Sequence, residues 1–294
     1  MRGAVGMNNH KSMKKTTAFI FVILALALKG LTQTGDLVKP DTVIVRCDSI
    51  ELSALVFRPK GKGPFPAVFF NHGRSITLNE RKTKTSQATI LGQLFAKRGY
   101  VFFAFFRRGE GLSFDKGVHI GELLDKKRES EGVEAANQLQ VQLLVTREFD
   151  DAVRAMTVLK TTPGVDTSRV GVVGHSFGGS LALLFAAGDT AIKATVDFAG
   201  GAGSWDNNSL LRSVLIAAVN QLICPVLFVF ASNDYSVEPG RVLDAELERK
   251  GKVHQLNIFP SFGKTAAEGH NIIYSGVEKW SLVVFSFLDQ HMMR

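Results

Sequence analysis

Several features that would define a specialised protein class are scarce or absent in this chain. The 294 residues contain only two cysteines, too few and too far apart in sequence to form a disulfide framework. Both Cys47 and Cys224 lie in apolar, strand-like stretches, where a buried free thiol is more common than a disulfide. No internal repeat, low-complexity tract or Pro/Gly-rich linker divides the sequence. The composition therefore excludes a collagen, a disordered chain and a disulfide-stapled scaffold.

Long hydrophobic runs are also missing. The longest, Ala18–Leu28, has 11 residues, whereas a helix that crosses a membrane needs about 20. Lys14 and Lys15 precede this run, and small or polar residues follow it, which is the three-part layout of a secretory signal peptide. The pattern predicts a leader over residues 1–34, although an uncleaved anchor and a buried N-terminal helix remain alternatives.

An acidic excess is absent, and the basic excess is concentrated near the N-terminus. The net charge is +8 for the whole chain, and the leader has five basic residues and no acidic one, so the mature net charge falls by five to about +3. This gives little support for nucleic-acid binding. We expect an exported protein, periplasmic or secreted, with no stable membrane anchor after processing. Met13, directly before the two lysines, is an alternative start.

The rest of the chain, residues 35–294, is expected to form one domain in which short strands alternate with helices. Strands are expected at residues 42–47, 52–58, 67–70, 101–106, 170–173, 194–198, 226–230 and 253–259. Helices are expected at residues 86–97, 122–144 (in two pieces), 150–159, 177–187, 210–222, 242–249 and 277–290. This order predicts an eight-stranded, mostly parallel sheet with helices on both faces, in which the first two strands form a hairpin. Active groups should then lie at the carboxyl ends of the strands.

One irregular segment interrupts this alternation. Residues 112–146 form an insertion that we expect to cover part of the pocket, as a lid would. Phe105, Phe106 and Phe114 are expected to form an apolar wall nearby. The roles of Arg107 and Arg108 remain open, because they are equally suited to bonding loop carbonyls and acids or to meeting an anionic substrate.

The strongest local motif is Gly174-His175-Ser176-Phe177-Gly178-Gly179. It follows an apolar strand and opens a helix, which is the context of a nucleophile elbow. Glycines at 174 and 178 are needed because a Cβ there would clash with the crossing backbone. The turn lifts the Ser176 hydroxyl clear of the sheet and directs the helix N-terminus toward it. We therefore expect Ser176 to be a nucleophile.

A serine nucleophile needs a base, and seven histidines are available: His10, His72, His119, His175, His254, His270 and His291. His270 follows the last expected strand, so its loop lies at the active edge of the sheet, and the preceding glycine gives the ring room to turn inward. His175 should point away from the serine, and His254 falls within a strand. His270 is therefore the expected general base.

The acid that orients this histidine should follow a strand located between the serine and the histidine. Asp234 lies in the exit loop of the 226–230 strand and suits this role. Glu238 and Asp197 are rivals, and Asp234 also fits an N-cap or Asx-turn. The order Ser, Asp, His differs from the trypsin-like and subtilisin-like orders and is that of an α/β-hydrolase.

An oxyanion needs hydrogen-bond donors as well. The backbone N–H of Phe177, directly after the nucleophile, is one candidate. The second should come from the loop Asn71-His72-Gly73-Arg74, where the N–H of Arg74 is best placed.

The domain resembles the dienelactone-hydrolase-like and prolyl-oligopeptidase-like branch of the α/β-hydrolases nearly from end to end. The matching stretches are Phe70-Asn71-His72-Gly73-Arg74, Arg107-Arg108-Gly109-Glu110-Gly111-Leu112-Ser113, Asp166-Thr167-Ser168-Arg169-Val170, the Ser176 motif, Asn233-Asp234 and Glu268-Gly269-His270. The resemblance implies the α/β-hydrolase fold, a Ser–Asp–His triad and acyl transfer without a cofactor. The chain departs from the family pattern in three ways. Ser176 stands where true dienelactone hydrolases have a cysteine, and the chain has no room for the propeller domain of the oligopeptidases. The HGGG loop of many lipases is absent, because Arg74 occupies its third position.

These residues together predict a serine hydrolase that cleaves a carboxylic ester or a related small acyl compound. No His, Cys and Asp cluster has metal-ligand spacing, so no metal site is expected. Two alternatives remain: an exported peptidase that acts on short peptides, and a non-catalytic binding module on the same fold.

Overall fold

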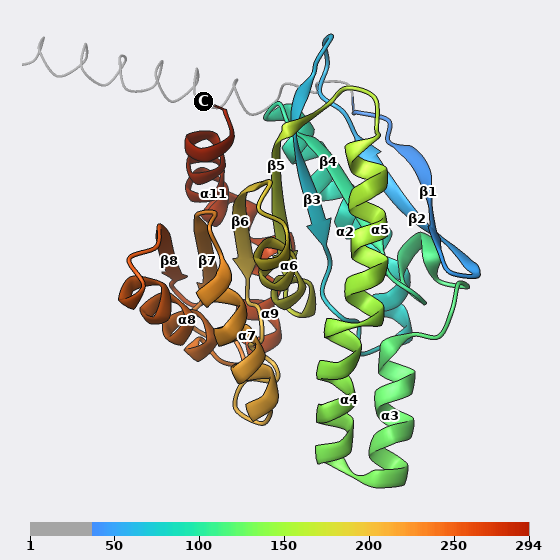
Figure 1. The fold of residues 1–294 in the computed structure, drawn as a ribbon, viewed down its shortest axis with the longest axis vertical. Helices are drawn as coiled ribbons and strands as arrows, with labels where there is room; N and C mark the ends of the chain where they lie inside the picture. Colours follow the sequence, from blue (N-terminus) through green and yellow to red (C-terminus); the bar gives the residue numbers. More distant parts are fainter. Residues whose placement is uncertain (1–36, 294) are drawn as a thin grey trace, which may run out of the picture. The chain divides into compact units, whose positions relative to one another are not determined.

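The alternating strands and helices assemble into one mixed sheet in the computed structural model, which describes residues 37–293 (Figure 1). The strands are β1 (Asp41–Cys47), β2 (Ile50–Phe57), β3 (Phe65–Asn71), β4 (Val101–Phe106), β5 (Val165–His175), β6 (Ile192–Phe198), β7 (Val226–Ala231) and β8 (His254–Phe259). Their spatial order is β1-β2-β4-β3-β5-β6-β7-β8. The pairs β1–β2 and β2–β4 are antiparallel, and the other neighbours are parallel. The predicted eight-stranded, mostly parallel sheet is confirmed.

Helices cover both faces of this sheet. The helices are α2 (Leu78–Lys97), α3 (Ile120–Glu131), α4 (Val133–Val145), α5 (Arg147–Lys160), α6 (Phe177–Gly188), α7 (Ser209–Gln221), α8 (Glu238–Arg249), α9 (Ala266–His270), α10 (Ile272–Ser275) and α11 (Val277–Met292), with a 3₁₀ turn η1 at Gly111–Ser113. One apolar core joins the sheet to α3–α8, and the other joins it to α2, α10 and α11.

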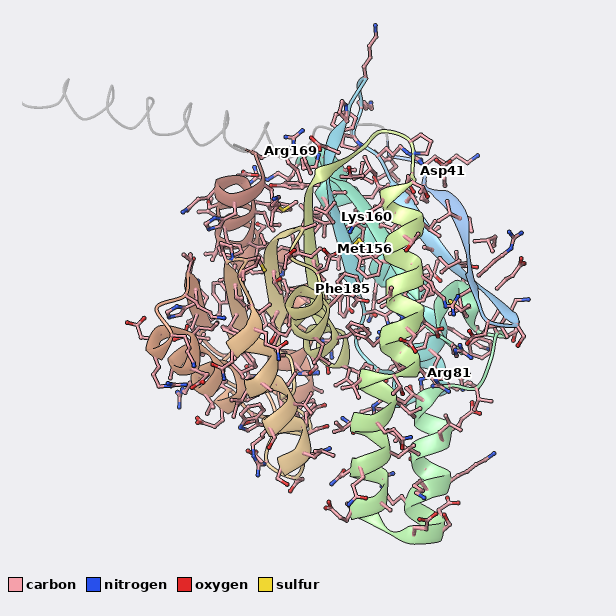
Figure 2. All side chains as sticks on the ribbon, viewed as in Figure 1. Asp41, Arg81, Met156, Lys160, Arg169 and Phe185 are labelled. Carbon is pink, nitrogen blue, oxygen red and sulfur yellow. The ribbon has the colours of Figure 1, made fainter. Side chains whose placement is uncertain are left out.

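Strand β4 shows how the sequence supplies both cores. All six of its residues are buried, and alternate side chains point to opposite faces of the sheet. Phe103 and Phe105 belong to the α3–α8 core, together with Met156 and Phe185, which Figure 2 labels. The side chains between them belong to the other core. Burying a phenylalanine contributes about 1.5–3 kcal/mol, so this strand is a major source of stability.

Three expected boundaries were wrong. Helix α2 begins at Leu78 rather than at 86, because the side chain of Thr77 and that of Glu80 form a capping box at its N-terminus. Strand β5 begins at Val165 rather than at 170. The segment of His270, expected as a loop, forms the short helix α9.

The insertion expected at residues 112–146 contains a helical hairpin. Helices α3 and α4 lie side by side and project from one end of the sheet (Figure 1). Gly132 makes the turn between them with φ of +89°, a conformation that glycine adopts without strain.

Other sequence expectations have mixed outcomes. Cys47 and Cys224 are free and buried, as expected. Within residues 37–293, no helix is both long and apolar enough to cross a membrane. The expected leader at residues 1–34 and the alternative start at Met13 lie outside the described residues.

Candidate active site

Ser176 lies on a sharp turn between β5 and α6. Its backbone has φ of +55° and ψ of −118°, a conformation that costs a non-glycine residue about 1–3 kcal/mol. The turn also requires glycines on both sides. A Cβ on Gly174 would lie 2.0 Å from the Gly178 carbonyl oxygen, and one on Gly178 would lie 2.1 Å from that of Asn71. The packing therefore explains the glycines of the motif.

His270 ends α9, whose N-terminus is fixed by a second capping box, between Thr265 and Glu268. The ring is 9% exposed, and its Nδ1 lies 2.8 Å from Oδ1 of Asp234. If Nδ1 donates this hydrogen bond, Nε2 carries no proton and is free to accept one. The structure thus joins two of the three residues expected to form the triad.

Asp234 follows β7 and is held by the backbone as well as by the histidine. Its buried Oδ1 also accepts a hydrogen bond of 2.6 Å from the N–H of Tyr235. The rings of Tyr235 and His175 each lie with their centroids 4.9 Å from that of His270, and His175 Nε2 donates to the His270 carbonyl at 2.8 Å. These contacts hold the His270 ring.

Asn233 connects the aspartate loop to the histidine loop. Its Nδ2 donates to the carbonyls of Phe262 and Thr265 at 3.0 and 2.9 Å, and its Oδ1 accepts from the Phe262 N–H at 2.8 Å. A Cβ on Gly269 would lie 2.6 Å from this Oδ1, so glycine before His270 is required for close approach. The sequence motif pointed to Asn233 but gave no reason for it.

Ser176 and His270 face one cavity of about 490 Å³ at the carboxyl end of the sheet. Its lining comes from the loop after β3, α2, α4, α6, the loop after β6, α7, Tyr235 and the α9–α10 region. It includes Arg74, Glu80, Lys84, Gln87, Gln140, Leu144, Phe177, Ser180, Ser204, Leu211, Asn271 and Tyr274. Among the described residues, no hydrogen bond joins the Ser176 hydroxyl to the His270 ring. Gln140 and Leu144 bring α4 of the insertion into the cavity wall.

Two backbone N–H groups are candidates for an oxyanion hole. Phe177 is the first residue of α6, so its N–H has no acceptor within the helix. Arg74 lies in the loop after β3, and its N–H donates to no group in the part of the chain that the structure describes. Both residues line the cavity with Ser176. The geometry therefore leaves two donors available beside the serine.

Two cationic side chains add positive charge to the cavity. The ammonium of Lys84 is buried and lies 5.9 Å from the ring centroid of Tyr274, within the electrostatic influence of Glu110 and Glu80. Burial lowers the pKa of Lys84. The guanidinium of Arg74 forms no hydrogen bond or ion pair with a described residue. The sequence gave no signal for Lys84, because it lies in a polar run.

The rival acids occupy other positions. Glu238 pairs with Arg241 within α8 at 2.9 Å. Asp197, at the end of β6, is fully buried. Its Oδ1 accepts from the Gly200 N–H at 2.8 Å, and its Oδ2 has no hydrogen-bond partner among residues 37–293. Burial and the nearby charge of Asp234 raise the pKa of Asp197 to about 7, although the Gly200 hydrogen bond opposes this.

The expected aromatic wall is wrong. Phe105 and Phe106 are buried in the two cores, because β4 is a central strand covered on both faces. Phe114 lies beneath the guanidinium of Arg81, 4.8 Å away, and does not line the cavity. Arg107 and Arg108 do not line it either: Arg107 is buried near Glu110 and Glu148, and Arg108 forms a bidentate pair with Asp151 at 2.6 and 2.9 Å.

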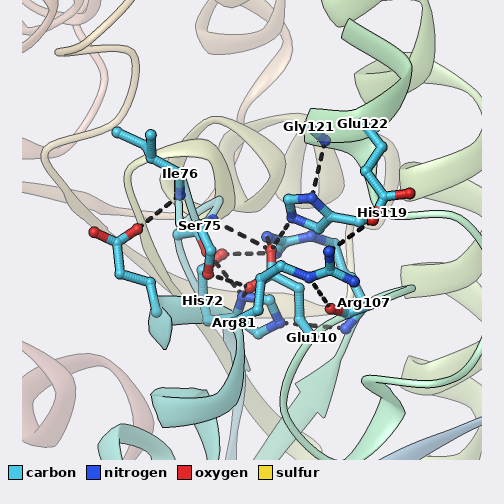
Figure 3. A network of polar contacts seen from close by, with 12 residues as sticks. His72, Ser75, Ile76, Arg81, Arg107, Glu110, His119, Gly121 and Glu122 are labelled. Carbon is cyan, nitrogen blue, oxygen red and sulfur yellow. Dashed lines mark hydrogen bonds and ion pairs between the residues drawn. The ribbon is translucent and has the colours of Figure 1, made fainter. Parts of the chain in front are cut away.

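The described residues contain no group of three or more His, Cys, Asp or Glu side chains that could hold a metal ion. His72 and His119 belong to a buried network around Glu110 (Figure 3). His254 lies at the start of β8, where its Nδ1 contacts the Lys252 carbonyl at 2.7 Å.

Known families and structures share this architecture. The model of the dienelactone hydrolase family matches residues 52–291. No curated protein matches the chain. Acylaminoacyl peptidase from Pyrococcus horikoshii is similar over 90% of this chain, with a TM-score of 0.62 and 17% identity, but the match covers only 43% of the peptidase.

Two smaller proteins match over nearly their whole length. A dienelactone hydrolase from Anabaena variabilis has a TM-score of 0.57 and 17% identity, with 87% of this chain and 99% of that protein covered. An esterase from Pyrococcus furiosus has a TM-score of 0.61 and 17% identity, with 87% and 94% covered. At these identities the structural likeness shows the fold.

Proposed function

The chain belongs to the dienelactone hydrolase family, and from that membership and the cavity's geometry we propose that it is a serine hydrolase of small carboxylic esters. The observation that carries the proposal is the 2.8 Å contact between His270 and Asp234 in a cavity that also holds Ser176 on its strained turn. These are the three side-chain types that nucleophilic acyl transfer needs.

The proposed reaction proceeds through an acyl-serine. Nε2 of His270 takes the hydroxyl proton as Oγ of Ser176 attacks the acyl carbon, and the imidazolium then gives this proton to the departing alcohol oxygen. Water next gives a proton to His270 and attacks the acyl-serine, which releases the acid and restores the hydroxyl. Asp234 holds the histidine tautomer and stabilises the imidazolium through Nδ1.

The Arg74 and Phe177 N–H groups are the proposed oxyanion donors. Negative charge develops on the carbonyl oxygen of the substrate during both attacks, and preorganised N–H groups stabilise it. Removing one such donor typically lowers kcat by about 10²–10³. The N-terminus of α6 adds a favourable dipole at the same place.

The test uses the purified protein with p-nitrophenyl acetate and butyrate, and a fluorophosphonate probe. We expect hydrolysis and labelling, both of which Ser176→Ala abolishes. Ser213→Ala is the matched control, because its exposed hydroxyl bonds only to the Ser209 carbonyl within α7. Activity that persists in Ser176→Ala would exclude Ser176 as the nucleophile. Absence of both activity and labelling in the wild type would favour a binding module.

The same assay addresses peptides. A panel of esters of increasing chain length is compared with aminoacyl amides. Since the cavity has a volume of about 490 Å³, we expect short acyl chains to be preferred. Faster cleavage of the amides than of the esters would identify a peptidase instead.

Export is a second part of the proposal. It is supported by the apolar run Ala18–Leu28, with two lysines before it. N-terminal sequencing of the protein recovered from the periplasmic or secreted fraction should show a start near Gly35. A cytoplasmic protein that begins at Met1 or Met13 would refute this.

A further inference from the structure

We infer that Arg107 and Glu110 are positioning residues that hold the two oxyanion donors in place from beneath the cavity, a role that rests on the proposed function. Neither residue lines the cavity, so neither touches substrate. Both belong to the motif Arg107-Arg108-Gly109-Glu110-Gly111, which the proposed chemistry leaves unexplained.

Arg107 holds the beginning of the oxyanion loop, residues 72–75. Its Nη1 donates to the His72 carbonyl at 2.6 Å, and its backbone N–H donates to Nε2 of the His72 ring at 3.2 Å. Because Nε2 accepts, Nδ1 carries the proton and faces the Gly73 carbonyl at 2.9 Å. Burial and the charge of Arg107 lower the pKa of His72 to about 3, so the ring stays neutral.

Glu110 holds the end of the same loop. Its carboxylate accepts from the Ser75 hydroxyl at 2.6 Å and from the Ser75 N–H at 3.3 Å (Figure 3). Arg74, whose N–H is the proposed donor, lies between the residues held by Arg107 and Glu110. The loop is thus attached on both sides of the group that must be placed accurately.

Arg107 also contacts the second donor residue. Its guanidinium carbon lies 5.1 Å from the ring centroid of Phe177, a cation–π distance. Arg107 therefore contacts both the His72 carbonyl and the Phe177 ring. A shift of its guanidinium would change the spacing between the two donors, and an error of 1 Å in such spacing can cost about 10² in rate.

Arg107 and Glu110 are both buried, and removing their charges from water costs free energy. Arg107 is 1% exposed and Glu110 is 0% exposed. Burial alone would raise the pKa of Glu110, but the hydrogen bond from His119 and the positive charges of Arg107 and Lys84 lower it well below its usual value. A buried ion pair is often no more stabilising than well-packed apolar residues. The position of the Arg107–Glu110 pair beneath the oxyanion loop is therefore better explained by accurate placement of that loop than by a contribution to the stability of the fold.

The pair is anchored in turn to both ends of the α3–α4 hairpin. His119 caps α3 through Nδ1 and donates from Nε2 to Glu110 at 3.1 Å. Glu148, in the first turn of α5 after the hairpin, lies 3.4 Å from Nε of Arg107. The position of the α3–α4 hairpin is therefore linked to that of the oxyanion loop, and α4 of this hairpin also lines the cavity.

The test compares Glu110→Gln and Ser75→Ala with Asp151→Asn. Asp151 is the matched control, because it pairs with Arg108 in the same motif and does not contact the oxyanion loop. We expect kcat for p-nitrophenyl butyrate to fall about 100-fold in Glu110→Gln and about 10-fold in Ser75→Ala, with KM changed less than threefold. Asp151→Asn should keep the wild-type kcat.

A thionoester, in which sulfur replaces the carbonyl oxygen, reports on the oxyanion hole itself. The wild type should strongly prefer the oxygen ester, and the ratio of the two rates should fall about tenfold in Glu110→Gln while Asp151→Asn keeps it. Hydrogen exchange of residues 72–75 should be faster in Glu110→Gln than in the wild type.

Unchanged hydrogen exchange in folded Glu110→Gln, or an unchanged rate ratio, would overturn the positioning role. If Glu110→Gln fails to fold, Ser75→Ala decides by the same two measurements. Failure of the proposed function is separate, because it would appear as a wild type without esterase activity or fluorophosphonate labelling, and hydrogen exchange would still decide the role of Glu110.

Discussion

Replacing Asp197 by asparagine should change how stability depends on pH. The pKa of Asp197 is raised from 3.8 to about 7 in the folded protein by burial and by Asp234. The folded state therefore binds a proton that the unfolded state has released between about pH 4 and pH 7. Because the folded state binds more protons, the free energy of unfolding falls as pH rises through this window.

The size of the effect follows from the shift. About three pKa units at 1.36 kcal/mol per unit correspond to about 4 kcal/mol lost between pH 4 and pH 8. Asparagine does not titrate and can still accept the Gly200 N–H through its amide oxygen, so Asp197→Asn should escape this loss. The free energy of unfolding of the variant, relative to that of the wild type, should therefore increase by about 4 kcal/mol between pH 4 and pH 8.

The assay is urea unfolding of both proteins at a series of pH values. Other titrating groups are the same in the two proteins, so the difference between their unfolding free energies isolates Asp197. Replacing Asp234 by asparagine as well should reduce the difference, since one of the charges that raises the pKa is then removed. A difference that stays constant from pH 4 to pH 8 would refute the reasoning.

Three further outcomes are expected. Asp234→Asn should lower kcat in esterase assays by about 10⁴-fold, because the amide favours the wrong tautomer of His270. A loss of less than tenfold would exclude Asp234 as the orienting acid. Lys84→Met should raise KM at least tenfold for a p-nitrophenyl ester that carries a carboxylate and leave KM for p-nitrophenyl acetate unchanged, since the ammonium lies in the cavity wall and can form a charge-assisted hydrogen bond. Equal effects on both esters would contradict this. Gly178→Ala should cost more than about 3 kcal/mol in urea unfolding, because its Cβ would lie 2.1 Å from a carbonyl oxygen. Gly132→Ala is the comparison, because its Cβ would have no described atom within 4 Å and only its positive φ would be unfavourable, so it should cost about 1–2 kcal/mol. Equal losses of stability in the Gly178 and Gly132 variants would refute the steric argument.

Much of the fold could be predicted because its local signals agree with its packing. Each expected strand is present, since short apolar runs between helices have no other way to be buried. The errors at α2 and α9 were avoidable. Thr77 with Glu80 and Thr265 with Glu268 are capping boxes that can be read from the sequence. The first marks the true start of α2, and the second marks α9, a helix that the apolar pattern did not indicate.

The site was predictable only in part. The turn around Ser176 depends on glycines at fixed spacing, so it could be inferred from sequence. The burial of Lys84 could not, because this lysine lies in a polar run of α2 and the Tyr274 ring near it comes from α10, far along the chain. The predicted aromatic wall was wrong for a similar reason: Phe105 and Phe106 are close to the insertion in sequence but are held in a strand covered on both faces.

Helix α11 has a consequence for biosynthesis. Phe285 packs against Phe95, with ring centroids 4.9 Å apart, and the hydroxyl of Tyr100 donates to Asp289 at 2.7 Å. These partners are separated by almost two hundred residues. We therefore expect the phenylalanine-rich surface that α11 covers to stay exposed in the nascent chain until Met292 has left the ribosome. A truncated product that stops before Val277 should therefore aggregate or be bound by a chaperone rather than persist as a soluble fragment.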